Sequence, residues 1–124
     1  MRVLDGEEML DAPFPYFGGK RTIADQVWLR FGDVTNYCEP FFGSGAVLLK
    51  RPADHIRRYE TVNDKDGYVA NFWRAVKSKP EETAKYADNP VNENDLHARH
   101  FWLLARKDNL AAQLEGDPDF CDPK

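Results

Sequence analysis

The chain has 124 residues, 42% of them hydrophobic and 13% aromatic, which is enough for one domain of modest size with a packed core. Its net charge of −4 argues against a free-standing nucleic-acid-binding protein, because phosphate contacts need clustered lysine and arginine. The two cysteines, Cys38 and Cys121, form no CxxC pair, so we expect reduced thiols in a cytoplasmic protein and no metal site. The acidic start lacks a long apolar run, which excludes a signal peptide and a membrane span from the prediction.

Residues 1–12 carry four acids and few apolar anchors, which predicts a mobile extension without a function. The motif Pro-Tyr-Phe-Gly-Gly-Lys follows at residues 15–20 and places a Gly-Gly turn and Lys20 just before a predicted helix. Its aromatic residues either line a ligand site or form an apolar cluster at the edge of a sheet. A phosphate-binding P-loop is excluded, because position 21 is Arg where Ser or Thr is required and position 14 is Phe where Gly is required.

The stretch 22–31 predicts a helix that ends at Gly32. Its apolar residues Ile23, Val27 and Phe31 recur every four positions. This stripe predicts the face that lies against the sheet.

The stretch 36–49 is the most informative part of the chain. An apolar run ends in the acid Glu39, passes through Gly43 and Gly45, and enters a second apolar run, which predicts strand, tight turn and helix. The predicted helix begins at Ala46 and is stopped by Pro52. The glycines allow positive φ and close approach of a ligand, and the helix offers free amide groups. This pattern is typical of a nucleotide-cofactor loop, although an ordinary loop can also contain it.

A second strand is predicted over residues 59–63, and Asp64 lies at its tip, 19 residues beyond Gly45. An acid at this distance from a glycine loop is where a Rossmann-like sheet binds a ribose. The alternative is that Asp64 only forms a turn or caps the next helix.

The rest of the chain predicts helices. Residues 66–77 have an apolar face made by Val69, Phe72, Trp73 and Val76. Ser78 and Glu81 match a capping box for a short helix over residues 79–88, which Asn89-Pro90 ends. Asn92 then caps a longer helix that reaches about Leu114.

Three of these motifs resemble, in the same order, the opening of the Dam-like adenine-specific DNA methyltransferases, which use S-adenosylmethionine. They are Pro-Tyr-Phe-Gly-Gly-Lys, Glu-Pro-Phe-Phe-Gly-Ser-Gly-Ala-Val and Asn-Asp, within residues 13–77. The resemblance implies an α/β fold: an incomplete Rossmann-like methyltransferase sheet of two parallel strands with flanking helices in residues 13–66, followed by a helical segment, residues 67–124, that starts a DNA-recognition insert. The cofactor-binding residues that it implies are Tyr16, Gly18, Gly19, Lys20, Glu39, Pro40, Phe41, Gly43, Ser44, Gly45 and Asp64.

Within that resemblance, Lys20 offers its ammonium group to the methionine carboxylate, Tyr16 lines the site and Asp64 binds the ribose. The residues expected to face DNA phosphates are Arg99, His100, Arg106 and Lys107, together with His97. A solvated helix face is the alternative for this set.

The family's catalytic tetrapeptide, Asp-Pro-Pro-Tyr or a close variant, is absent, and the chain contains no Pro-Pro. Residues 117–120, Asp-Pro-Asp-Phe, resemble it in type but follow no strand pattern, so they predict a surface turn. We therefore expect the amino-terminal part of an adenine methyltransferase that lacks its carboxyl-terminal half, has no catalytic residue of its own and meets double-stranded DNA through the complete enzyme. The alternatives are a non-catalytic module for an adenosine ligand and a structural domain with a vestigial loop.

Overall fold

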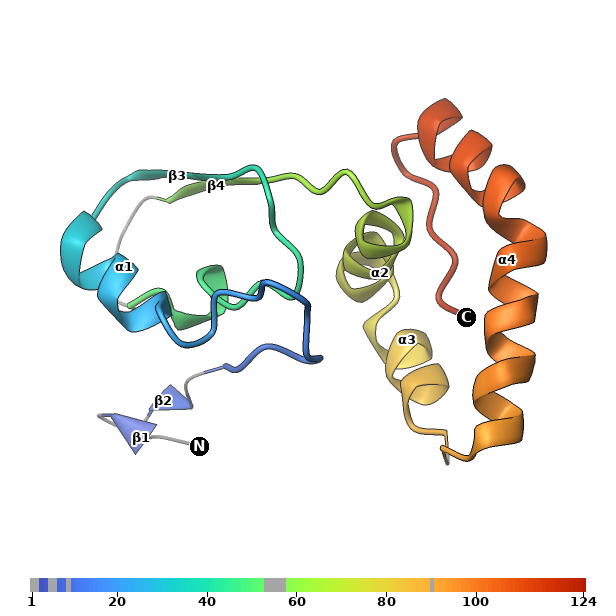
Figure 1. The fold of residues 1–124 in the computed structure, drawn as a ribbon. Helices are drawn as coiled ribbons and strands as arrows, with labels where there is room; N and C mark the ends of the chain where they lie inside the picture. Colours follow the sequence, from blue (N-terminus) through green and yellow to red (C-terminus); the bar gives the residue numbers. More distant parts are fainter. Residues whose placement is uncertain (1–2, 5–6, 9, 53–57, 90) are drawn as a thin grey trace. The chain divides into compact units, whose positions relative to one another are not determined.

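The computed structural model describes residues 3–4, 7–8, 10–52, 58–89 and 91–124 (Figure 1). The chain divides into two compact units, Met1–Asp64 and Lys65–Lys124. Over the described ranges the protein is a mixed α/β chain with four α-helices and a pair of parallel strands. In this part of the chain no helix is both long and apolar enough to cross a membrane.

The amino-terminal unit is built on strands β3, Asn36–Glu39, and β4, Tyr59–Val62. They pair in parallel with the register Asn36↔Tyr59 to Glu39↔Val62, which confirms the prediction of two neighbouring parallel strands. Two further strands, β1 (Val3–Leu4) and β2 (Glu7–Glu8), pair antiparallel within the segment predicted as an extension. That segment ends in Ala12, which is buried and accepts a 2.7 Å hydrogen bond from Arg21.

Helix α1, Ala24–Phe31, packs its Ala24 and Trp28 side chains into the core with Tyr37 and Val47. Trp28 donates Nε1–H to the carbonyl of Val47 over 2.7 Å, and the Trp28 and Tyr37 rings lie 4.9 Å apart. The prediction that Ile23, Val27 and Phe31 form the buried face of this helix was therefore wrong in part.

Of these residues, Ile23 and Phe31 are about half exposed, although the Phe31 ring still contacts Trp28 and Tyr37, and Val27 packs against the core. The buried face is set one position away because Trp28, the largest side chain of the helix, gains both ring contacts and a hydrogen bond there.

The prediction of an α-helix after the glycine loop was also wrong, because the structure has a different type of helix there. Only the 3₁₀ turn η1, Leu48–Lys50, forms, and Arg51 adopts an extended conformation with ψ 130°. The residue before a proline is pushed out of the α region, so Pro52 prevents further helical turns at once. Among the described residues after the glycine loop, the predicted α-helix is therefore replaced by this single 3₁₀ turn.

The carboxyl-terminal unit contains α2 (Gly67–Ser78), α3 (Pro80–Ala87) and α4 (Glu93–Gly116). Asp66 caps α2 by accepting from the Tyr68 amide, and Asn92 caps α4 by accepting from the Asp95 amide, the latter as predicted. The predicted capping box was wrong, because Ser78 is the last residue of α2 and Lys79 occupies the N-cap position without a side-chain bond. Pro90, one of the two residues predicted to end α3, lies outside the described residues.

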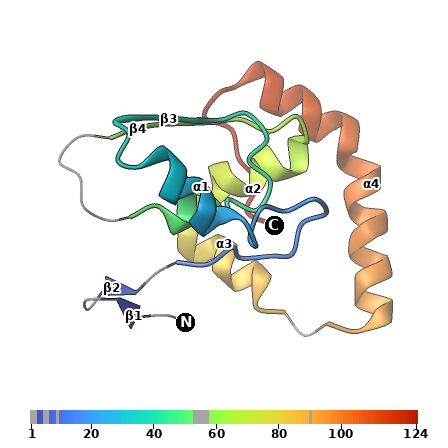
Figure 2. The ribbon, with the colours of Figure 1, turned by 60° about the vertical axis from the view of Figure 1, so that its left-hand side comes forward.

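The last eight residues run back alongside α2 (Figure 2). Residues 117–120 form the predicted turn, in which the Phe120 amide donates to the carbonyl of Asp117 over 3.2 Å. Arg74 of α2 donates to the carbonyls of Leu114, Asp117 and Phe120. Asn71 binds the backbone of Asp122 with one donated and one accepted bond, both 2.7 Å long.

Candidate functional site

The lysine loop, residues 15–20, is closed by a hydrogen bond of 2.8 Å from the Gly19 amide to the carbonyl of Tyr16. Gly18 has φ 70°, the left-handed conformation that glycine adopts without strain. The turn delivers the ammonium group of Lys20 to the end of β3. There its Nζ lies 3.1 Å from Oε1 of Glu39 and also donates to the carbonyl of Phe41.

Glu39 is a buried carboxylate, 5% exposed, at the last position of β3. Side chains two apart on a strand share a face, so Tyr37 lies beside Glu39 and donates its hydroxyl to Oε2 over 2.7 Å. Burial and this hydrogen bond to Glu39 raise the pKa of Tyr37 above its ordinary value of 10.0, so the hydroxyl keeps its proton and remains a donor. In the described residues Oε1 of Glu39 has only the ion pair with Lys20 and no hydrogen bond of normal geometry.

The glycine loop continues the pairing of the two strands beyond their ends. Phe42 donates its amide to the carbonyl of Asn63, and Asn63 donates its own amide to the carbonyl of Glu39, each over 2.9 Å. Gly43 then donates its amide to Oδ2 of Asp64 over 2.7 Å. Asp64 is thereby fixed against the glycine loop, as expected for strand tips that share one edge of a sheet.

Gly43 is also a point where the lysine loop touches the glycine loop. A Cβ atom added to Gly43 would lie 2.7 Å from Cδ1 of Tyr16, closer than atoms of two side chains approach. The φ of Gly43 is 54°, and that of Gly45 is 71°, so both positions favour glycine through the backbone as well. The three loops predicted from the sequence therefore converge, with Lys20 and Asp64 both reaching the stretch 39–43.

The predicted site residues fall into two groups. Those that are buried hold the loops together: Glu39, Gly43, Ser44 and Gly45. Those that are exposed or half exposed surround them: Tyr16, Gly18, Gly19, Lys20, Pro40, Phe41 and Asp64. Phe17 is fully exposed and Phe41 is 76% exposed, so the aromatic residues of the loops do not simply form a covered cluster. Large exposed aromatic side chains beside buried polar groups are typical of a ligand site.

Sequence reasoning missed Tyr37 and the structural role of Asn63. The signal for Tyr37 was present, because a residue two positions before a buried acid on a strand shares its face. Asn63 was recognised only as part of the Asn-Asp motif. The structure shows that its backbone bonds both ends of the Glu39–Phe42 stretch and that its Nδ2 donates to the carbonyl of Pro40 over 3.2 Å.

The candidate DNA-facing residues all lie on α4, in the other unit, and all are exposed: His97, Arg99, His100, Arg106 and Lys107. Arg106 differs from the rest because its guanidinium lies over the Trp102 ring, 4.2 Å from the centroid. Asp117, in the sequence that resembles the catalytic tetrapeptide, is exposed in a turn after a helix. Within the described ranges no group of three or more His, Cys, Asp or Glu side chains could hold a metal ion.

The family model described as D12 class N6 adenine-specific DNA methyltransferase matches residues 16–117. The match begins in the lysine loop, includes all three converging loops and extends to the end of α4. No curated protein and no solved structure matches the chain.

Proposed function

Because the chain belongs to the family of D12 class N6 adenine-specific DNA methyltransferases, we propose that its three converging loops bind S-adenosylmethionine. When bound, this cofactor supplies the methyl group that is transferred to the exocyclic nitrogen of adenine. The observation that carries the proposal is the joining of the lysine loop, the glycine loop and Asp64 at the ends of β3 and β4. Ligands of open α/β sheets bind at such strand ends.

The methionine end of the cofactor carries one carboxylate and one ammonium group, and the loops offer a partner for each. The ammonium group of Lys20 has three N–H donors. Two of them face Glu39 and Phe41 in this structure, which leaves the third for a carboxylate. Oε1 of Glu39 is buried and, among the described residues, has only the ion pair with Lys20, so it becomes available to the cofactor's ammonium group when Lys20 turns to the cofactor's carboxylate. Tyr37 supports this arrangement by holding the other oxygen of Glu39.

The adenosine end meets the glycine loop and Asp64. A carboxylate has about four acceptor positions, so the bond from Gly43 to Asp64 is compatible with further bonds to ribose hydroxyls. The small residues Gly43 and Gly45 let the backbone approach the ligand. Tyr16 and Phe41 offer exposed aromatic surface at the rim.

We further propose that β3 and β4 belong to a larger Rossmann-like sheet. Parallel sheets are normally covered on both faces, yet all four residues of β4 are exposed, including Tyr59 at 64% and Val62 at 40%. A further segment that carries the family's Asp-Pro-Pro-aromatic motif would cover this surface and contribute the group that orients the adenine. Double-stranded DNA is then the substrate of the completed enzyme, with the exposed cations of α4 as candidate phosphate contacts.

Calorimetric titration of the chain with S-adenosylmethionine tests the cofactor proposal. Asp64→Asn keeps an oxygen for the Gly43 amide but removes the charge, and a hydrogen bond to a charged group contributes ~1.5–3 kcal/mol. We therefore expect binding to weaken tenfold or more. Asp25→Asn is the matched control, since Asp25 is an exposed acid on α1 of the same unit. Equal affinities of the Asp64 and Asp25 variants would remove Asp64 from the site, and no binding by the unmodified chain would contradict the proposal.

One alternative is a module that binds an adenosine ligand without transferring a methyl group. The lack of Pro-Pro in the sequence favours it. The two functions differ in the preferred ligand: a methyltransferase site prefers S-adenosylmethionine to adenosine, because the Lys20–Glu39 pair contacts only the methionine end. Affinity for adenosine equal to that for S-adenosylmethionine would support the binding module.

A further inference from the structure

A cavity of about 570 Å³ lies in the carboxyl-terminal unit, lined by α2, α3, α4 and the segment 120–124. This volume is within the usual range for small-molecule sites. All of its lining residues belong to the carboxyl-terminal unit, so it is separate from the loops that we assign to the cofactor.

Three cations line this cavity: Lys79, Arg106 and Lys124. The Arg106 guanidinium and the Lys124 ammonium lie 4.2 and 5.1 Å from the centroid of the Trp102 ring, which holds both positive groups on one aromatic side chain. In the described part of the chain, none of the three forms an ion pair with a carboxylate. The side chains that line the cavity therefore carry a net positive charge, three cations against the single acid Asp122.

The one acidic lining residue, Asp122, sets one negative charge against the three positive ones and forms no ion pair with them among the described residues. Its Oδ1 accepts a 3.0 Å bond from the backbone amide of Lys124, and its own backbone is held by Asn71. The segment is thus fixed in place beside α2, and the cations remain available to an anion from solution.

Two amide side chains line the same cavity as the cations. Asn109 and Gln113 are four residues apart on α4 and therefore share a face of the helix. Both are exposed, and neither side chain makes a hydrogen bond within the described ranges. Amide groups that offer both donors and acceptors are the usual partners of a nucleobase edge. The rings of Tyr68 and Phe72 supply apolar wall, and the hydroxyl of Tyr68 is fixed by a 3.1 Å bond to the carbonyl of Leu103.

From these contacts we propose that the cavity binds a nucleotide. The phosphate group meets Lys79, Arg106 and Lys124, and the base meets the amides of Asn109 and Gln113. A bare phosphate would use the cations but not the amides, and a nucleoside would use the amides but not the cations. The ligand is therefore larger than an inorganic anion and carries a negative charge.

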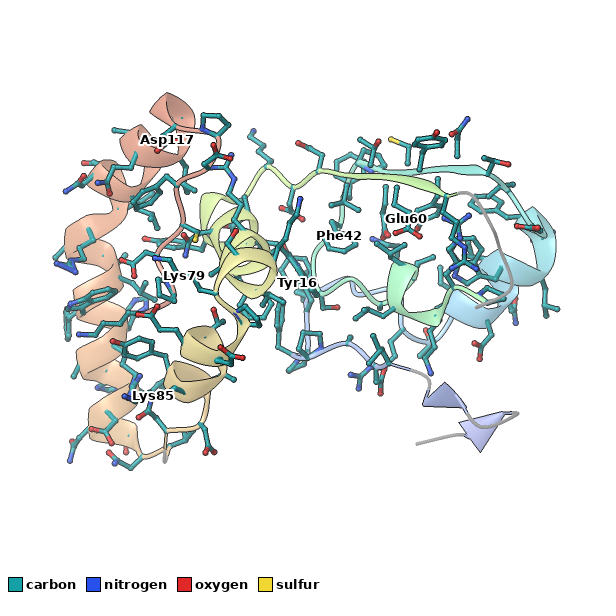
Figure 3. All side chains as sticks on the ribbon, turned by 180° about the vertical axis from the view of Figure 1, so that it is seen from behind. Tyr16, Phe42, Glu60, Lys79, Lys85 and Asp117 are labelled. Carbon is teal, nitrogen blue, oxygen red and sulfur yellow. The ribbon has the colours of Figure 1, made fainter. Side chains whose placement is uncertain are left out.

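The test is titration of the full-length Asp64→Asn chain, in which the proposed adenosine site of the loops is weakened, with adenosine monophosphate, and with inorganic phosphate and adenosine as the two partial ligands, at constant ionic strength. Adenosine monophosphate should bind at least tenfold more tightly than either partial ligand. Lys79→Gln and Arg106→Gln should each weaken its binding tenfold or more, and Arg106→Lys, which keeps the charge, should retain most of the affinity. The control is Lys85→Gln, an equal change of charge on α3 outside the cavity (Figure 3).

Equal binding of inorganic phosphate and adenosine monophosphate would overturn the proposal, as would equal losses of affinity in the Lys79 and Lys85 variants.

Titration with a single-stranded oligonucleotide and with a duplex distinguishes a free nucleotide from a nucleotide unit of nucleic acid. Tighter binding of either polymer, with the same dependence on Lys79 and Arg106, identifies a nucleotide unit of nucleic acid. Tighter binding of the monophosphate identifies a free nucleotide. Because S-adenosylmethionine binding is measured separately and depends on Asp64, failure here leaves the proposed function intact.

Discussion

Tyr37 and Glu39 are two buried polar side chains, and the Tyr37 hydroxyl donates to Oε2 of Glu39 over 2.7 Å. Replacing Tyr37 with Phe removes the hydroxyl group and leaves the buried Oε2 of Glu39 without its hydrogen-bond donor. An unsatisfied buried acceptor of this kind lowers stability by ~1–3 kcal/mol. We expect the free energy of unfolding to fall by that amount at neutral pH. Chemical denaturation measures it, and an unchanged value would mean that the bond contributes nothing to stability.

The same residue predicts a dependence on alkaline pH. Burial, then the hydrogen bond and charge of Glu39, raise the pKa of Tyr37 above 10.0, so the folded chain keeps a proton that the unfolded chain loses. Stability from this group is complete below pH 10 and is lost as the pH rises towards the folded-state pKa, because the unfolded state then binds fewer protons. The stability difference between the unmodified chain and Tyr37→Phe should therefore shrink as the pH is raised above about 10. A difference that stays constant would contradict the raised pKa.

Gly43 is constrained by its backbone and by its neighbour together. An alanine there has φ 54° and places its Cβ 2.7 Å from the Tyr16 ring, whereas an alanine at Gly18 has φ 70° but meets no atom within 4 Å. Positive φ alone costs ~1–2 kcal/mol. Gly18→Ala should therefore lower the free energy of unfolding by about that amount, and Gly43→Ala should lower it further. Equal losses in the two variants would show that Tyr16 moves aside without cost.

At the scale of elements, the periodicity of apolar residues predicted where the helices and strands lie. It did not predict which face of a helix is buried or which type of helix forms. The strands β3 and β4 and the helices α1, α2 and α4 were expected within one or two residues of their bounds. The buried face of α1 was misjudged because a four-residue repeat of apolar side chains carries no information on the Trp28–Val47 hydrogen bond. The end of the helical segment before Pro52 was predicted correctly, but its type was misjudged, because the α-helix expected from Ala46 is only the 3₁₀ turn η1.

The segment after α4 depends on α2 for its position, which gives a prediction at this scale. Asn71→Ala removes both bonds to the backbone of Asp122, so residues 121–124 should detach from α2. Cys121 is buried and Cys38 is exposed, so the two thiols can be followed separately with a thiol reagent. We expect Cys121 to react severalfold faster in Asn71→Ala while Cys38 reacts at its usual rate.

Asn94→Ala is the matched control for that experiment, since Asn94 is exposed in the first turn of α4. It should leave both thiols unchanged. Faster reaction of Cys121 in the control variant would mean that general loosening of the unit, and not the loss of the Asn71 bonds, exposes the thiol.

At the scale of the whole molecule, the sequence was sufficient to bring the site loops together. Glycine spacing, Lys20 and Asp64 placed three loops at the ends of two strands, and the structure joins them through Gly43 and Glu39. The pairing of Tyr37 with Glu39 and the cavity of the carboxyl-terminal unit were not predicted. Both depend on which side chains face each other once elements distant in sequence pack, and no local pattern encodes that.

The final prediction concerns catalysis. The chain contains no Asp-Pro-Pro-aromatic motif, so nothing in it matches the family's group that orients the adenine nitrogen towards the methyl group. Orientation of reactants accounts for ~7–11 kcal/mol of a barrier, and cofactor binding cannot replace it. The purified chain should therefore transfer no labelled methyl groups to DNA, and transfer should begin when a segment carrying that motif is added in trans. Asp117→Ala serves as the control for the similar sequence at residues 117–120, which lies in an exposed turn. Methyl transfer by the chain alone that is abolished by Asp117→Ala would show that this turn is the catalytic motif after all.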